Sequence, residues 1–473
     1  ENVEIHLVEA TDRIGGHAWS VSTKDELEEP VDVGFMVLNE QTYPNLLRIF
    51  TDLGVPTEPS DMSLAVFDSQ NSWSFQSSSS WLVRMMFRFR FWNFLRSHKA
   101  FSTKAVEYLS NTGKYRHSTV AEFCEGLDRD FCENWLIPFV SAVWSVGDGQ
   151  SRDFCAIPLL KFMDNHRFLT LGTIPWRTPA QRSNSYVQAI LENCPSLIVH
   201  KEHPAKTIHT ATKELELTNG EKLKFDELIL ACSAPKQAAL AAPSQEWLKC
   251  FRVSRSRVVG HTIPSGMPQD KSEWSSWNVR GAGPQNNDVH GDLASVTYWL
   301  SRIQNLKSPN RFVSVNPSSE PEGIFFDEMM EHPIMDMDAI CAQKQEHKYQ
   351  GIDGIYHAGA WLRNGFHEDA FFTGCLAARR ALGRDDVPIE YPTGSVGIIP
   401  PTPILGVTHH IRHQETPRQF SYPLYLYKWD TRCPPASFYR EDFFGDINTP
   451  LDTAVRQELC KRLKVWPLGR IYV

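Results

Sequence analysis

Two segments far apart in the chain carry residue types whose spacing suits a bound dinucleotide. The first runs from Val8 to His17 as Val-Glu-Ala-Thr-Asp-Arg-Ile-Gly-Gly-His. A carboxylate at the end of a strand, here Glu9, is suited to accept hydrogen bonds from adenosine ribose hydroxyls. Gly15 and Gly16 permit positive φ angles and a close backbone approach to a ligand. We therefore favour a cofactor site here over a plain strand end and turn.

The second segment runs from Gly359 to Gly374 and has the pattern of a strand, a glycine turn and a new helix. The N-terminus of a helix attracts phosphate and any cofactor that becomes anionic on reduction. Phe366, His367, Glu368 and Asp369 fall at the start of the expected helix. Taken with the first segment, this pattern predicts dinucleotide binding rather than a glycine turn in a core.

Two histidines are candidates for proton transfer, because imidazole titrates near neutral pH. They are His367, in the second segment, and His166. For each, a structural role is the favoured interpretation. Oxidation by hydride transfer to a bound redox cofactor needs no strong base, since the cofactor carries the chemistry. The sequence therefore assigns no catalytic base.

The elements that would position these residues follow from the apolar pattern. Residues 3–8 predict a buried parallel strand that ends at Glu9, like the second strand of a Rossmann unit. In such units the GxGxxG loop precedes the acidic residue by about 20 positions, so that loop is expected before residue 1. Residues 40–55 predict a helix that stops at Gly54.

Further elements follow along the chain. Residues 69–80 predict a hairpin or loop, and residues 118–145 a set of helices. The Asn-Gly pair within 215–223 predicts a hairpin with a type I′ turn. Strands are expected at 225–232, 293–300, 312–316 and 355–359. Residues 385–407, rich in Pro and Gly, predict a linker to a separate tail at 408–473.

Composition bounds the function. The 473 residues allow two or three domains, and a net charge of −8 argues against a nucleic-acid partner. Fourteen Trp and 27 Phe suggest a large apolar pocket. Ten Cys without a CxxC pair give no metal site, and their irregular spacing favours a reduced, intracellular chain over disulfides. The sequence contains no stretch of about 18 apolar residues, so no membrane-spanning helix is predicted.

The segment from Val8 to His17 resembles the GG motif of the flavin amine oxidase and phytoene desaturase superfamily, which usually has Arg where this chain has His17. Other segments resemble FAD/NAD-binding proteins that are often encoded beside cyclopropane-fatty-acid synthases. They are residues 31–35, 42–46, 144–145, 165–166, 176–178, 276–278 and 365–369. The resemblance covers about residues 3–383, and its motifs recur in order.

The resemblance implies an α/β fold with a Rossmann-type FAD domain interleaved with an α+β substrate domain. The FAD domain is expected at 1–60, 195–240 and 345–383, and the substrate domain at 61–194 and 241–344. It also implies FAD as the cofactor. The implied cofactor-binding residues are Glu9, Arg13, Gly15, Gly16, His17, Gly34, Phe35, Gly359, Phe366, His367, Glu368 and Asp369.

The tail of the chain resembles a second family. Segments of 413–446 resemble a domain of unknown function, DUF1365, so that 384–407 is the expected linker and 408–473 a partial domain of this type.

The related proteins are expected to have Gly-Gly at the position of Gln181-Arg182. Loss of both glycines predicts a weakened flavin contact there.

Residues 81–99 mix Arg and Lys with Phe, Trp and Met. Such a segment could lie on a membrane surface and admit an acyl chain. The alternative is a domain helix with snorkelling arginines, which we favour because the segment shows no clean apolar face.

Three functions stay open from the sequence. The first is an FAD-dependent oxidoreductase that oxidises a CH–CH or CH–NH bond of an apolar, lipid-like substrate. The second is a truncated or degenerate flavoprotein that serves as a non-catalytic partner of a lipid-modifying enzyme, with a lipid methyltransferase as the implied partner. The third is an amine or polyamine oxidase. The expected location is cytoplasmic or at a membrane surface; targeting is not readable because Glu1 falls inside a domain.

Overall fold

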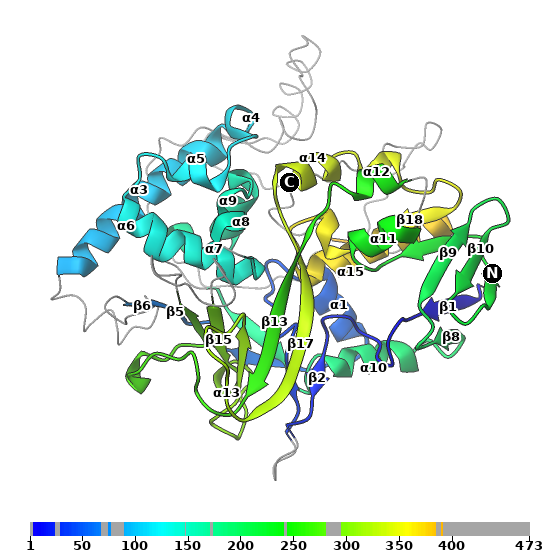
Figure 1. The fold of residues 1–473 in the computed structure, drawn as a ribbon, viewed down its shortest axis with the longest axis horizontal. Coiled ribbons are helices and arrows are strands. Elements are labelled where there is room, and N and C mark those ends of the chain that lie inside the picture. Colours follow the sequence, from blue (N-terminus) through cyan, green and yellow to red (C-terminus); the bar gives the residue numbers. More distant parts are fainter. Residues whose placement is uncertain are drawn as a thin grey trace, which may run out of the picture.

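A computed structural model of the chain describes residues 3–23, 29–67, 74–76, 89–146, 148–170, 174–240, 244–280, 295–384 and 389–390. These residues form two halves that meet along a broad junction (Figure 1). One half has a large mixed sheet under a layer of helices. The other has parallel strand pairs packed with helices. This arrangement confirms the predicted α/β class.

The first half is built on a seven-stranded sheet with the order β17-β13-β16-β15-β14-β5-β6. Its neighbours are antiparallel, except that β14 and β5 are parallel. The predicted strands at 293–300 and 312–316 are confirmed as β15 and β16, and the described part of 69–80 pairs with β5 as a hairpin. The members are β5 (Leu64–Phe67), β6 (Ser74–Gln76), β13 (Val253–His261), β14 (Trp277–Arg280), β15 (Ser295–Trp299), β16 (Phe312–Val315) and β17 (Ile324–Pro333).

A layer of helices covers one side of this half (Figure 1). Its core is aromatic: Phe101, Phe123 and Trp135 are fully buried, and the rings of Phe101 and Phe123 meet edge to face at 5.8 Å. The helices predicted within 118–145 are confirmed. The members are α3 (Phe89–Ser110), α4 (Thr112–Tyr115), α5 (Val120–Cys124), α6 (Arg129–Phe131), a π-helical turn η1 (Cys132–Leu136), α7 (Ile137–Trp144), α8 (Asp148–Arg152) and α9 (Ala156–Asn165).

The second half contains two parallel strand pairs, β1–β8 and β12–β18, and an antiparallel sheet, β11-β10-β9. The helix predicted at 40–55 is confirmed as α1, which begins at Pro44 and is followed by Gly54 at a φ of 67°. The strands are β1 (Ile5–Val8), β8 (Leu197–His200), β9 (Ala205–His209), β10 (Glu214–Leu217), β11 (Lys222–Lys224), β12 (Leu228–Leu230) and β18 (Ile355–His357). The helices are α1 (Pro44–Asp52), α10 (Asn184–Glu192), α11 (Ala234–Leu240), α12 (Gln245–Leu248), α14 (Met337–Gln343) and α15 (His367–Leu382).

Several short elements complete the described fold. Two small antiparallel pairs, β2–β3 and β4–β7, are separate from the larger sheets. The strands are β2 (Ser20–Val21), β3 (Val31–Asp32), β4 (Thr57–Ser60) and β7 (Trp176–Pro179). The short helical turns are η2 (Phe168–Thr170), α13 (Leu300–Ile303), η4 (Lys271–Glu273), η5 (Glu346–Lys348) and η6 (Ala360–Leu362).

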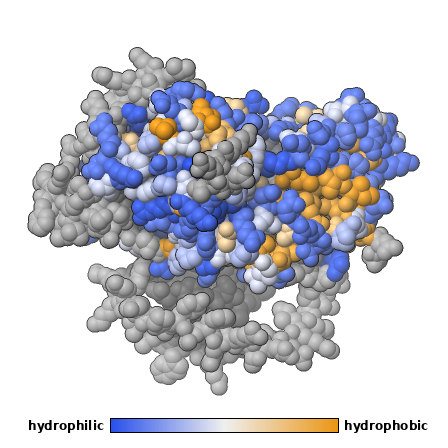
Figure 2. Space-filling model, turned by 90° about the horizontal axis from the view of Figure 1, so that it is seen from below, coloured by the Kyte–Doolittle hydropathy of each residue, from blue (hydrophilic) through white to orange (hydrophobic). Residues whose placement is uncertain are grey.

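The predicted burial of the first strand was wrong, although its parallel pairing was right. Val3 and Ile5 are each 49% exposed. Among the described residues β1 pairs only with β8, where Ile198 and Val199 are exposed as well. Parallel strands are buried when helices and neighbouring strands cover them on every side, and β1 has this cover on one edge only. A broad apolar area appears on this side of the molecule (Figure 2).

The predicted type I′ turn was also wrong, although the hairpin itself is confirmed by the pairing of β10 with β11. A type I′ turn needs positive φ at both central residues. Gly220 has a φ of 89°, but Asn219 is not among the residues with positive φ. The side-chain oxygen of Asn219 instead accepts the N–H of Glu221 at 2.9 Å. This local bond favours a longer loop between the strands.

Several predictions lie wholly or mainly outside the described residues. They concern residues 81–88 of the basic segment, most of the linker and the tail at 408–473, whereas residues 89–99 of that segment lie in α3, in agreement with the favoured domain helix. Within the part of the chain that is described, no helix combines the length and apolar character needed to cross a bilayer. The proposed domain boundaries stay predictions.

Candidate functional site

A cavity of about 590 Å³ lies where the two halves meet. This volume is within the range of pockets that hold cofactors and small ligands. One wall comes from the loops after β1 and β3 and from the turn before α15. The opposite wall comes from the large sheet and from α7 and α9, with apolar side chains that include Leu64, Phe139, Val143, Val258, Trp277, Tyr298, Val315 and Met330.

Glycines bring backbone rather than side chain to the first wall. A Cβ on Gly34 would lie 2.3 Å from the carbonyl oxygen of His17, so no larger residue fits there. Gly15 has a φ of 125° and Gly359 a φ of 151°, which side chains rarely adopt. All three glycines line the cavity. They leave a shallow cradle in which a flat ligand could contact the main chain.

Arg13 supports this cradle from behind and does not line the cavity in the described structure. Its Nη2 donates to the carbonyl oxygen of Gly16 at 2.8 Å. Its guanidinium lies 3.9 Å from the ring centroid of Trp19. The predicted role of Arg13 in cofactor binding is therefore at most indirect, through the shape of the glycine loop.

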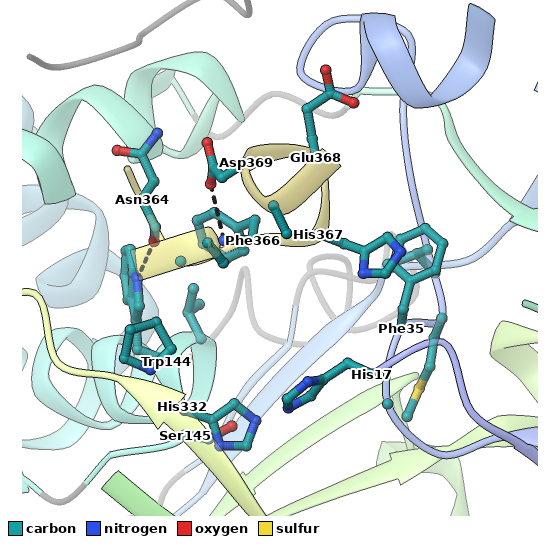
Figure 3. A pocket seen from close by; sticks show the side chains of 18 of the residues that line it. His17, Phe35, Trp144, Ser145, His332, Asn364, Phe366, His367, Glu368 and Asp369 are labelled. Carbon is teal, nitrogen blue, oxygen red and sulfur yellow. Dashed lines mark hydrogen bonds between the residues drawn. The ribbon is translucent and has the colours of Figure 1, made fainter. Parts of the chain in front are cut away.

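The N-terminus of α15 opens on the cavity (Figure 3). Asp369 accepts the backbone N–H of Phe366 at 2.9 Å and forms an ion pair with the buried Arg363 at 3.2 Å. The indole of Trp144 donates to the carbonyl oxygen of Asn364 at 2.9 Å, which ties α7 to the turn. The turn is thus held from both sides, with the positive end of the helix dipole directed at the cavity.

Glu368 points away from the cavity, towards α1 (Figure 3). Its Oε1 accepts the backbone N–H and the Nδ2 of Asn45, and its Oε2 accepts the N–H of Leu46 at 2.9 Å. Burial raises the pKa of this carboxyl to about 7, against the effect of these hydrogen bonds. Both oxygens are engaged within the protein, so the structure shows Glu368 as a brace between α15 and α1.

His367 is held in a fixed position. Its ring stacks on Phe35 with centroids 4.0 Å apart, and its Nε2 lies 2.5 Å from the hydroxyl oxygen of Tyr186. Burial and, to a smaller extent, the nearby His17 lower the pKa of His367 to about 3. An imidazole that stays neutral and bonded in this way favours the structural interpretation over proton transfer.

His166 has a similar environment within an aromatic cluster. Its Nδ1 donates to the carbonyl oxygen of Phe162 at 2.7 Å, and its ring stacks on Trp176 at 5.5 Å. Burial lowers its pKa to about 4. Phe162 also stacks on Phe366 at 5.0 Å, beside Trp144. The cluster brings Trp144, His166, Trp176 and Phe366, which are far apart in the sequence, to one wall of the cavity.

Sequence reasoning missed His332, at the end of β17. It lines the cavity, and its ring meets that of His17 edge to face at 5.5 Å. Burial and the nearby His17 lower its pKa to about 3. No motif or spacing marks this residue, and more than half of the chain separates it from His17.

Glu9, like Arg13, does not line the cavity among the described residues. Its Oε1 accepts both the N–H and the hydroxyl of Thr11, each at 2.8 Å. It directly follows β1, which ends at Val8. Its contact with a ribose stays a prediction.

Gln181 and Arg182 stand where the related proteins are expected to have two glycines, and the backbone of Arg182 has a conformation that suits glycine. Arg182 has a φ of 71°, in the left-handed region. Its side chain is buried, with Nε donating to the carbonyl oxygen of Pro30 and Nη1 without a partner among the described residues. The missing glycine therefore leaves backbone strain at this position.

The residues present fit a bound FAD. The glycine cradle offers main-chain contact to a flat ring system, and the N-terminus of α15 faces the space where negative charge would gather. Gly15, Gly16, His17, Gly34, Phe35, Gly359 and the turn at 366–369 all line the cavity, as the sequence predicted that they would lie together.

Comparisons with known proteins agree with this fit. Residues 1–249 match the family model described as flavin containing amine oxidoreductase. A search of curated proteins found no match. The fold is similar to cyclohexylamine oxidase from Brevibacterium oxydans IH-35A, at 14% identity and a TM-score of 0.56, over 80% of this chain and 92% of that one.

Two further solved structures share the fold. A fatty acid isomerase from P. acnes that produces CLA matches at 13% identity and a TM-score of 0.56, over 80% of this chain and 98% of that one. A reduced UDP-galactopyranose mutase matches at 14% identity and a TM-score of 0.55, over 80% and 90% of the two chains. At these identities the likeness shows the fold alone.

Proposed function

The chain belongs to the flavin-containing amine oxidoreductase family and is an FAD-dependent oxidoreductase, and from that premise we propose that it oxidises a CH–CH or CH–NH bond of an apolar, lipid-like substrate. The observation that carries this proposal is the composition of the cavity. Its far wall consists of aliphatic and aromatic side chains from the large sheet and from α7 and α9. Such a surface favours an apolar ligand through burial of hydrocarbon.

The cofactor contacts belong to the same proposal. The glycine cradle, with His17, Phe35 and the turn that begins at Phe366, would hold the FAD, and Glu9 would bind its ribose. Bound FAD supplies the electron acceptor for oxidation of a C–H bond. The chain's own residues orient the substrate against the cradle, and the apolar wall excludes water from it. Fixed imidazoles such as His367 shape the site without carrying charge.

A second candidate, oxidation of an amine, is favoured by the aromatic cluster around Trp144, Phe162 and Phe366. Aromatic faces bind cationic groups when they are free to face them. Here the faces of Phe162 and Phe366 are stacked on each other with an angle of 18° between their planes. This packing reduces the area open to a cation, so we rank amine oxidation below lipid oxidation.

The deciding experiment has two steps. The purified chain is mixed with FAD, and a bound-flavin absorption band is recorded after removal of free FAD. Under anaerobic conditions, acyl esters or primary amines of equal chain length are then added. We expect bleaching by an acyl substrate and none by the amine. Bleaching by amines alone would replace the proposal with amine oxidation, and a failure to retain FAD would contradict both.

A further inference from the structure

We propose, resting on the lipid-like substrate argued above, that His332 recognises an uncharged oxygen, a hydroxyl or a carbonyl, on that substrate. His332 would thus be a specificity-determining residue of the cavity. The argument depends on its position, on the hydrogen bonds around it and on the charges that face the cavity.

His332 lies at the border between the polar and the apolar walls. It is the residue before Pro333, which ends β17, and it lines the cavity together with Met330. Its ring lies beside that of His17, which directly follows the glycine pair (Figure 3). A ligand that extends from the glycine cradle into the apolar wall passes this pair of rings.

The imidazole rings of His17 and His332 differ in their hydrogen bonds. The ring of His17 bonds to the backbone of Glu331, which fixes its position. Nδ1 of His332 is buried without a hydrogen-bond partner among the described residues. Rotation of the imidazole ring by 180° exchanges the positions of Nδ1 and Cδ2, so a nitrogen can be placed on either edge of the ring. A buried polar atom left unpaired is costly, and a ligand oxygen would remove that cost.

The charges on the cavity wall limit which polar group fits. Burial lowers the pKa values of His332 and His367 to about 3 and that of His166 to about 4, so these rings are neutral at neutral pH. A neutral imidazole has one donor and one acceptor nitrogen. It therefore suits a hydroxyl, which donates and accepts, or a carbonyl, which accepts.

A cationic head group has no partner here among the described residues. Three acidic residues line the cavity, and the carboxylate of each is engaged elsewhere. Glu331 accepts from Ser233 at 2.8 Å and lies 3.4 Å from Arg255. Glu368 is bonded to α1, and Asp369 is paired with Arg363. Moving an ammonium from water into this apolar space without a carboxylate is strongly unfavourable.

The test compares three ligands of one chain length: dodecanol, dodecylamine and dodecane. Dissociation constants are measured on the full chain with FAD added, through quenching of the fluorescence of the tryptophans that line the cavity. We expect dodecanol to bind about tenfold more tightly than either of the others. Equal or tighter binding of dodecylamine would overturn the inference.

Variants assign the preference to His332. In His332→Leu the advantage of dodecanol over dodecane should disappear, while dodecane binds as before. His332→Gln retains a donor and an acceptor and should keep part of the advantage. His166→Leu is the matched control, because that ring is already bonded to Phe162 and should affect both ligands alike. Melting temperatures identify any variant that has failed to fold.

The outcomes separate this inference from the proposed function. If dodecane binds and dodecanol has no advantage, or if His332→Leu leaves that advantage unchanged, only the role of His332 is refuted. If none of the three ligands binds, the lipid-like substrate is refuted, and the recognition of its oxygen with it.

Discussion

The carboxylate of Glu368 accepts two hydrogen bonds from Asn45, one from the backbone N–H at 3.0 Å and one from the side-chain amide at 2.7 Å. Asn45 stands at the start of α1 and Glu368 in the first turn of α15. The N-terminus of α1, which favours an anion, is thus occupied by the protein's own carboxylate. This contact fixes the helix that opens on the cavity.

Glu368→Gln should destabilise the fold. The amide keeps one acceptor oxygen, but its nitrogen cannot accept the N–H of Leu46, which would be left buried and unpaired. We expect a loss of about 2 kcal/mol in the free energy of unfolding, measured by urea denaturation. Glu40→Gln, at an exposed position, is the control and should leave stability unchanged. Equal stability of both variants would contradict the bracing role of Glu368.

Asp32 should make stability depend on pH. Burial raises the pKa of this carboxyl to about 6, although Ser20 and Ser183 donate to it. Between about pH 4 and pH 6 the folded chain holds this proton and the unfolded chain has lost it, so the stabilising contribution falls as pH rises. The unfolding free energy of the wild type minus that of Asp32→Asn should therefore decrease by up to about 3 kcal/mol.

The same series with Asp52→Asn provides the control, because Asp52 is exposed. Its difference from the wild type should stay flat across this pH range. A difference for Asp32→Asn that rises with pH would mean that hydrogen bonding outweighs burial at this carboxyl.

Arg182→Gly should stabilise the chain. Glycine adopts a φ of 71° without the strain that arginine bears, and the change removes a buried guanidinium nitrogen that has no partner. We expect a gain of about 1 kcal/mol, seen as a higher melting temperature. Arg182→Ala loses the same side chain and the same bond to Pro30 but keeps the backbone strain, so it should be less stable than Arg182→Gly. If both variants gave the same gain, the side chain rather than the backbone would be the cause.

Gly34→Ala should abolish FAD retention. Its Cβ would overlap the carbonyl oxygen of His17 at 2.3 Å, so the loop that forms the cradle must shift. The expected result is loss of the bound-flavin absorption band after gel filtration with FAD. Gly374→Ala, in the middle of α15 with nothing near the added Cβ, should retain the band and raise helix stability by up to about 1 kcal/mol. Flavin retention by Gly34→Ala would refute the cradle.

Local patterns in the sequence were enough to predict many of the helices and strands. The stop of α1 at Gly54, the strands β15 and β16, and the strand, turn and helix from Ile355 to Leu382 follow from glycine conformation and from short apolar runs. The two glycine segments were also expected to share one site, and Gly15 and Gly359 do line one cavity. The local pattern failed at β1, because burial depends on what covers a strand and not on its own residues.

Only the tertiary structure decided which side chains carry out which task at the cavity. His332 has no sequence signal, yet the length of β17 brings it to His17. Glu368 matched the motif, yet its carboxylate is turned to Asn45. The sequence by itself determined that residues from 8–17 and 359–374 share one site, where Gly15, Gly16 and Gly359 line one cavity, since the backbone geometry there depends on glycine. The direction and charge of each side chain were decided by packing between segments that no local pattern relates.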